Sequence, residues 1–136
     1  MSDVKQAIFG VHANALMLRQ QRLDLIASNI ANTDTPGYKA QDIDFVAALR
    51  KASAPSTRPG ANAVRGGEPP AQRDVDVIGR EARFLRAPLQ PSLDGNTVDS
   101  QLEHAAFAKA ALEYRISLGF VEGKVRSLML AITGQQ

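Results

Sequence analysis

The chain of 136 residues contains no cysteine and no tryptophan, and only five phenylalanines and two tyrosines. The absence of cysteine excludes disulfide bonds and thiolate metal sites, and it leaves the redox compartment open. These aromatic side chains are few for a chain that would form a globular core on its own. Packing of helix on helix fits this composition better.

Long apolar runs and a strong charge of one sign are also missing. No stretch of about 18 apolar residues occurs, so the sequence predicts no membrane insertion of its own. The first residues include Asp3 and Lys5 and reach no apolar run of the length that a cleavable secretory peptide needs. The net charge of +2 is nearly balanced, whereas phosphate binding needs a concentrated basic face. Nucleic acid is therefore not an expected partner.

The sequence also lacks a group of residues that is typical of a catalytic site. His12 and His104 lie far apart, each within a predicted helix and without a second ligand at metal spacing, so each reads as a surface or packing histidine. Asp42 and Asp44 would share one side of an extended chain, but nothing basic or polar converges on them in sequence. We expect no enzyme activity, no cofactor and no metal.

What the chain has instead is a long helix, predicted over residues 99–133. Ser100 and Glu103 have the spacing of a capping box, Asp99 favours the positive helix end, and Gly134 provides the stop. An apolar seam with alternating steps of four and three follows Phe107, Ala111, Tyr114, Leu118, Val121, Val125, Leu128 and Ile132. A second apolar face, roughly opposite, collects Leu102, Ala105, Leu112, Ile116, Phe120 and Leu130. This helix therefore needs more than one neighbour.

A second amphipathic helix is predicted over residues 4–32. About half of its circumference is apolar, on two strips formed by Ile8, Val11, Ala15, Leu18 and Leu25 and by Leu16, Leu23, Ile26 and Ile30. Arg19 and Arg22 fall inside this apolar sector, where a guanidinium must reach water or find a carboxylate or carbonyl. Two readings stay open: the arginines lie at the rim with buried stems, or they fix the register against another subunit.

A segment rich in turn-forming residues ends the first predicted helix. Pro36 disfavours helical geometry at Thr35, and Pro36 with Gly37 provides the middle pair of a type II turn. Tyr38, Ile43 and Phe45 follow as apolar anchors. The corner is crowded with side chains that can satisfy exposed helix-end carbonyls, namely Asn29, Asn32, Thr33, Asp34 and Thr35.

The middle of the chain carries less information. Residues 52–73 are rich in Ala, Pro, Gly, Ser and Arg without apolar periodicity, which indicates an extended or mobile loop. Residues 74–78 alternate weakly and could form a short strand, with Phe84 and Leu85 covering one end of the helix pair. A tight turn centred on Asp94 and Gly95 then leads into the last helix.

Two parts of the chain resemble a known family. The run LRQQRLDLIASNIANTDTPGYKAQDIDF resembles the N-terminal signature of the bacterial flagellar axial proteins, in which an ANxxTPGY-like turn follows a long amphipathic helix. The runs QPSLDGNTVD and ALEYRISLGFVEGKVRSLMLAITG are similar to the proximal rod members. The polar, Asn-rich repeat of hook and distal-rod proteins is missing from the last helix. The positions that match the signature are Asn29, Asn32, Thr35, Pro36, Gly37 and Tyr38, which we assign to the turn and to an interface.

The expected fold is all-α: an antiparallel, coiled-coil-like pair of long N- and C-terminal helices. We divide the chain into 1–45, the helix and turn motif; 46–91, an extended, largely irregular insert that could include a short β segment; and 92–136, the helix that returns to pack on the first. Residues 1–45 and 92–136 would form one discontinuous domain. The residues expected at helix interfaces are Leu18, Arg19, Arg22, Leu25, Phe107, Tyr114, Leu118, Val121, Val125, Leu128 and Ile132.

The resemblance implies a structural subunit of the proximal rod of the flagellar basal body, which packs helices with like and related subunits and transmits torque. Its implied partners are itself, other rod proteins, the ring-to-rod junction protein and the flagellar type III export gate. Export would need no cleavable signal peptide. The alternatives are a cytoplasmic helical adaptor or chaperone partner, which would stay soluble and monodisperse alone, and a degenerate enzyme fragment with a defined pocket.

Overall fold

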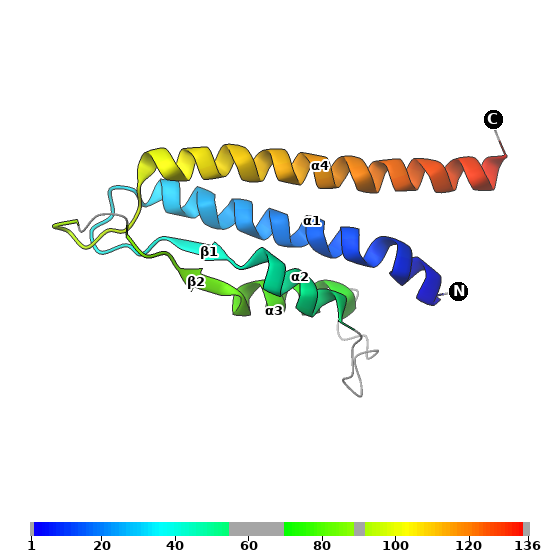
Figure 1. Cartoon of the computed structure of the whole chain (residues 1–136), viewed down its shortest axis with the longest axis horizontal. Coiled ribbons are helices and arrows are strands. Elements are labelled where there is room, and N and C mark those ends of the chain that lie inside the picture. The colour runs from blue at the N-terminus through cyan, green and yellow to red at the C-terminus, as the bar shows by residue number, and fades with distance from the viewer. Residues whose placement is uncertain (1, 55–69, 89–91, 135–136) are drawn as a thin grey trace.

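The computed structural model describes residues 2–54, 70–88 and 92–134, and the side chains of these except at 2–9 and 70–74. The elements in chain order are α1 (Ser2–Ala31), β1 (Gln41–Ile43), α2 (Phe45–Ser53), α3 (Pro70–Glu81), β2 (Arg83–Leu85) and α4 (Ser100–Thr133). α1 and α4 run side by side in opposite directions, and α2 and α3 lie on the other side of α1 (Figure 1). The predicted pair of long helices is confirmed. α1 is the middle layer.

The N-terminal cap of α4 differs from the predicted capping box. The Asp99 carboxylate, not the Ser100 hydroxyl, accepts from the first free amides, those of Gln101 (3.0 Å) and Leu102 (3.2 Å). The Glu103 carboxylate turns away from the helix end and binds side chains of other elements. The capping box was wrong because a stronger set of partners for Glu103 is distant in sequence. The predicted stop is confirmed, since Gly134 ends the helix in the left-handed conformation.

The insert is more regular than expected. Residues 45–53 and 70–81 are helical, so an extended, largely irregular insert is wrong for this part of the chain. The Asp44 side chain caps α2 by accepting from the Ala47 amide (3.0 Å). Residues 74–78 lie within α3 rather than in a strand, because Val75 and Ile78 repeat at helical spacing and both pack against the core. Residues 55–69, which hold most of the predicted loop, lie outside the described residues.

β1 and β2 form a two-stranded antiparallel sheet in which Asp42 lies opposite Phe84. The main buried cluster lies between α1 and this side of the molecule, not between α1 and α4. It consists of Leu18, Leu25, Ile43, Ala48 and Val75, with partly buried Met17, Phe45, Leu49, Ala52, Ile78 and Ala82 around it. Part of the insert therefore completes the core, while the domain boundaries proposed above stay a prediction. None of the described helices is both long and apolar enough to cross a membrane.

Candidate functional site

The segment after α1 forms the predicted turn. The Tyr38 amide donates to the Thr35 carbonyl (3.3 Å), and Gly37, with φ +73°, occupies the position that needs the left-handed region. The Gly37 amide in turn donates to the Asp94 carbonyl (2.9 Å), and the Tyr38 carbonyl accepts from the Thr97 amide (3.0 Å). The loops 32–40 and 92–99 are thus bonded to each other. We call this region, together with the last turn of α1, the turn end.

Asn29, which is fully buried, ties α1 to the chain that leaves the turn. Its Oδ1 accepts from the Gln41 amide (3.0 Å) and its Nδ2 donates to the Gln41 carbonyl (2.8 Å). The side-chain amide thereby imitates a neighbouring strand along the outer edge of β1. The same Nδ2 reaches Glu103 Oε2 on α4 (3.1 Å). One residue of the motif therefore joins three elements, α1, β1 and α4.

Asn96, which the sequence reasoning did not single out, performs a similar task from the other loop. Its Nδ2 donates to the carbonyls of Asn32 (3.1 Å), Thr33 (2.7 Å) and Thr35 (2.9 Å). Its Oδ1 accepts from the Val98 amide (2.8 Å). The side chain is only 6% exposed, and it satisfies carbonyls that the end of α1 leaves free. In the sequence, only the position of Asn96 directly after the predicted turn at Asp94 and Gly95 pointed to this role.

The other signature residues shape the same corner. Thr35 Oγ1 donates to Asn32 Oδ1 (3.1 Å), and Asn32 Nδ2 donates back to the Ser28 carbonyl (2.8 Å). The half-buried Tyr38 donates its hydroxyl to Asn29 Oδ1 (3.4 Å). Pro36 and Gly37 are exposed. These contacts give each residue a place in the turn, and the role of the exposed ones at an interface stays a prediction.

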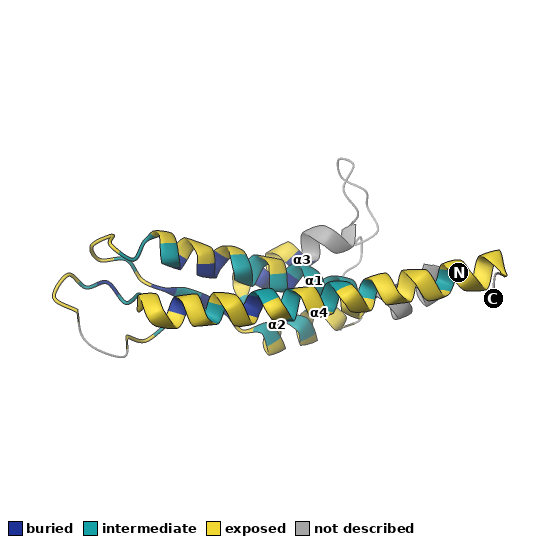
Figure 2. Cartoon of the chain, turned by 90° about the horizontal axis from the view of Figure 1, so that it is seen from above, coloured by how far each residue is buried: buried dark blue, intermediate teal, exposed yellow. Residues whose placement is uncertain are grey.

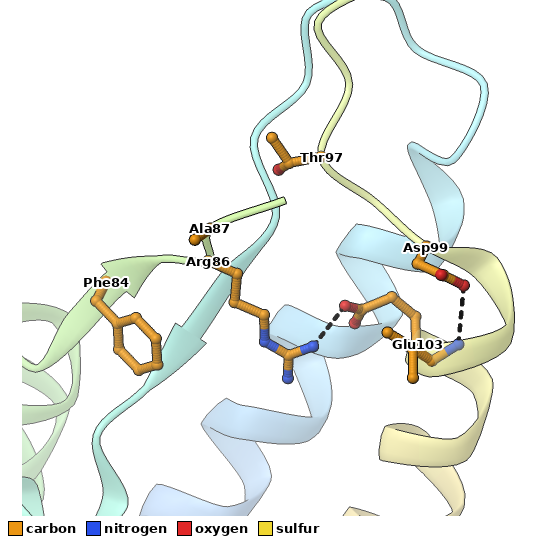
Figure 3. Close-up of a pocket in the computed structure, with 7 residues that line it drawn as sticks. Phe84, Arg86, Ala87, Thr97, Asp99 and Glu103 are labelled. Atoms are coloured by element: carbon orange, nitrogen blue, oxygen red, sulfur yellow. Dashed lines mark hydrogen bonds and ion pairs between the residues drawn. The ribbon is translucent and has the colours of Figure 1, made fainter. Parts of the chain in front are cut away.

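A chain of alternating charges joins α1, β1, the segment after β2, and α4. Arg22 binds Asp42 in bidentate fashion (2.9 and 3.0 Å), Arg86 binds the same carboxylate (2.6 Å), and Arg86 also reaches Glu103 (2.6 Å). Figure 3 shows the pair of Arg86 and Glu103 at a pocket between β2 and α4 that is also lined by Phe84, Ala87, Thr97, Asp99 and Leu102. Glu103 is 2% exposed and Asp42 4%. The expectation that nothing basic converges on Asp42 was wrong, because its partners lie 20 and 44 residues away.

Two members of this cluster, Asp42 and Arg22, have pKa values that favour their ionised forms. Burial acts to raise the pKa of Asp42, but hydrogen bonds from Arg22, from Arg86 and from the Ile43 amide outweigh it, so that the pKa lies below its usual value. The hydrogen bond to Asp42 raises the pKa of Arg22. All of these side chains are paired with one another. The cluster therefore holds the elements together, and it lacks the free acid and base that proton transfer in catalysis needs.

Arg19 and Arg22 both find carboxylates within the chain. Arg19 donates to Glu113 of α4 (3.1 Å) and lies over the ring of Phe45 (4.9 Å to the centroid). Arg22 is held by Asp42 and is 4.0 Å from Glu113. The arginines therefore fix α1 against its own chain, as half-exposed side chains at the rim. Whether they also meet another subunit stays a prediction.

The remaining interface residues divide into three groups. Leu18 and Leu25 are buried in the core of this chain. Tyr114, Leu118, Val121 and Leu128 are half-buried where α4 passes α1. The most exposed are Phe107 (39%), Val125 (46%) and Ile132 (80%). Figure 2 shows that exposed residues dominate the part of α4 farthest from the turn end.

The second predicted apolar face of α4 is largely exposed. Its large side chains, which are 46–63% exposed, are Leu102, Leu112, Ile116, Phe120 and Leu130. We call this set the outer face of α4. His12, predicted to be a surface or packing histidine, is exposed, and its ring stacks on Phe120 with centroids 6.1 Å apart. Among the described residues, no group of three or more His, Cys, Asp and Glu side chains could hold a metal ion.

Comparisons with known proteins agree with this geometry. The family model described as "Flagella basal body rod protein" matches residues 9–39, which span most of α1 and the turn. A flagellar basal body rod protein FlgB from Cereibacter sphaeroides is 44% identical over 126 residues, covering 93% of this chain and 94% of that protein. The proteins of the same name from Aeromonas hydrophila and Escherichia coli (strain K12) are 41% and 38% identical and cover 94% and 95% of both chains. The chain therefore belongs to the FlgB family of flagellar basal body rod proteins.

Proposed function

We propose that this chain is a structural subunit of the proximal rod of the flagellar basal body, and that it joins its neighbours through the outer face of α4. The observation that carries the proposal is that this face presents five large apolar side chains that each stay 46–63% exposed in the subunit. Full burial of an exposed apolar side chain contributes about 1.5–3 kcal/mol, and these side chains are already about half buried, so it takes several of them together to drive association. A structural rod subunit also needs no active site.

The mode of assembly follows from the same helix. Tyr114, Leu118, Val121 and Leu128 of the seam already lie against α1 of the same chain, so the outer face, on the opposite side of α4, is the surface left for a neighbouring subunit. Contacts between different surfaces of like or related subunits do not close on themselves, and they generate a helical filament unless other chains end it. Rod assembly with other rod components fits this arrangement. The chain of ion pairs from α1 to α4 would stiffen each subunit against torque.

Some partners are proposed from the family alone. The ring-to-rod junction protein and the flagellar type III export gate would be neighbours at the base of the rod, and the subunit would be exported without a cleavable signal peptide. The location is the basal body rod in the periplasm. The alternative of a cytoplasmic adaptor is disfavoured, because the similarity to rod proteins extends over more than nine tenths of the chain.

The test is a pair of double variants expressed in a strain that lacks the native gene. Ile116→Ser with Leu130→Ser removes two side chains of the outer face, each about half exposed, and should abolish co-sedimentation with purified basal bodies. Arg115→Ser with Arg126→Ser changes two exposed residues of the same helix at no lower cost in helix propensity, and should retain co-sedimentation. Circular dichroism melts should stay close to wild type for both. Incorporation of the apolar variant at the wild-type level would contradict the proposal.

A further inference from the structure

The two outer edges of the small sheet differ in whether their backbone groups are hydrogen-bonded within the chain. On β1, the Asn29 side chain accepts from the Gln41 amide and donates to the Gln41 carbonyl, and the Ile43 amide donates to Asp42 Oδ1 (2.8 Å). That edge is therefore occupied by the chain itself. An occupied edge cannot receive another strand.

The edge of β2 is open. The bonds from the Asp44 amide to the Ala82 carbonyl (3.0 Å) and from the Arg86 amide to the Ala40 carbonyl (2.8 Å), with Asp42 opposite Phe84, set the register of the ladder. Because bonded and non-bonded pairs alternate in an antiparallel ladder, the amides and carbonyls of Arg83 and Leu85 point away from β1. No hydrogen bond joins these four groups to any described residue. All three residues of β2 are exposed.

The side chains around this edge have a definite chemistry. Arg83 and Leu85 are two positions apart, so their side chains lie on the same face of the strand, and Leu85 is 63% exposed. Arg80, one helical turn before Arg83, is also exposed. Within the described part of the chain, neither arginine has an ion-pair partner. The strand is only three residues long and carries the charge of Arg83, so a segment that pairs with this edge must complement that charge as well as bond the free amides and carbonyls.

We propose that the outer edge of β2 pairs, in the assembled rod, with an extended segment of a neighbouring subunit. That segment carries a carboxylate opposite Arg83 and an apolar side chain two positions away, opposite Leu85. An extended segment is required because a helix has no free backbone groups along its length to bond the edge. We infer a carboxylate because Arg80 and Arg83 make no ion pair with any described residue, and an opposite charge directly across two strands stabilises their pairing. The inference rests on the proposed function, which supplies the neighbour, but it concerns a surface separate from α4.

The test uses two substitutions at one position. Leu85→Pro removes the outward amide but leaves the ladder to β1 intact, because the Leu85 amide takes no part in it, and an edge strand tolerates proline there. Leu85→Ala removes the side chain and keeps the amide. Each variant is expressed with tagged wild type, and the ratio of the two in purified basal bodies is measured. We expect the ratio for Leu85→Pro to be about fivefold below that for Leu85→Ala, as the loss of one hydrogen bond of about 1 kcal/mol implies. Equal ratios would overturn the inference.

A second experiment tests the same inference and does not depend on how the proline variant folds. A photo-crosslinking amino acid at position 85 is activated in assembled basal bodies, and the crosslinked peptide is identified by mass spectrometry. The inference expects a non-helical segment of another rod subunit with an acidic residue next to or two positions from the crosslink. A crosslink to a helix, or none in chains that still co-sediment, overturns it and leaves the proposed function standing. Failure of the wild-type chain to co-sediment would instead remove both.

Discussion

The turn end and the far part of α4 differ in how much of their structure the chain itself secures. At the turn end, Asn29 and Asn96 alone bond five backbone carbonyls and amides of other segments, and a buried run of ion pairs joins four segments. Beyond Glu113, by contrast, most large apolar side chains of α4 are exposed, and the described residues there contact α1 only by packing, as where His12 stacks on Phe120. The turn end is thus held together by directional bonds, whereas the far part of α4 is held only by packing. The far part therefore gains most from contacts with neighbours.

This difference suggests a division of labour along the molecule. Directional contacts between α1, β1 and α4 require an accurate geometry, so they fix the angle at which α4 leaves the turn end. Apolar faces are less selective and can adapt to like or related subunits. The turn end therefore sets the shape of the subunit, and the outer face of α4 provides the attraction.

The largest effect should come from breaking the buried end of the ion-pair chain. Glu103→Ala leaves Arg86 with one carboxylate fewer and Asn29 Nδ2 with one acceptor fewer, and should lower the free energy of unfolding by about 2–4 kcal/mol. Glu113→Ala is the matched control on the same helix. Glu113 is 32% exposed and should cost less than about 1 kcal/mol. Urea unfolding followed by circular dichroism measures both, and equal losses would contradict the contrast between the two regions.

A smaller effect should appear as a dependence on pH. The pKa of Asp42 is lower in the folded chain than in the unfolded chain, so its contribution to stability is present above the unfolded value of about 3.9 and is lost as the pH falls through the folded value. Asp42→Asn should therefore destabilise most near neutral pH, and its difference from wild type should shrink below about pH 4. Urea unfolding at pH 7, 4 and 3 tests this. A difference that stays constant with pH would refute the stated role of the carboxylate.

The sequence could predict the two long helices, the turn at Pro36 and Gly37, and the uncovered second face of α4, because each depends on local periodicity or on a residue with restricted geometry. The partners of Glu103 and Asp42 could not be predicted, since they are set by how distant segments pack. The helices of the insert were missed for a related reason. Val75 and Ile78 at a spacing of three resemble a weak alternation over only five residues, and burial against α1 decides between the two.

The contrast between the two regions is tested most directly by hydrogen exchange of the isolated chain, resolved by residue. The account predicts slow exchange at the amides of Gln41 and Val98 and in α4 from Glu103 to Ala110, where side-chain bonds or burial hold the structure. It predicts much faster exchange from Leu118 to Thr133, which slows only when the subunit is assembled. Equal protection along the whole of α4 in the free chain would contradict it.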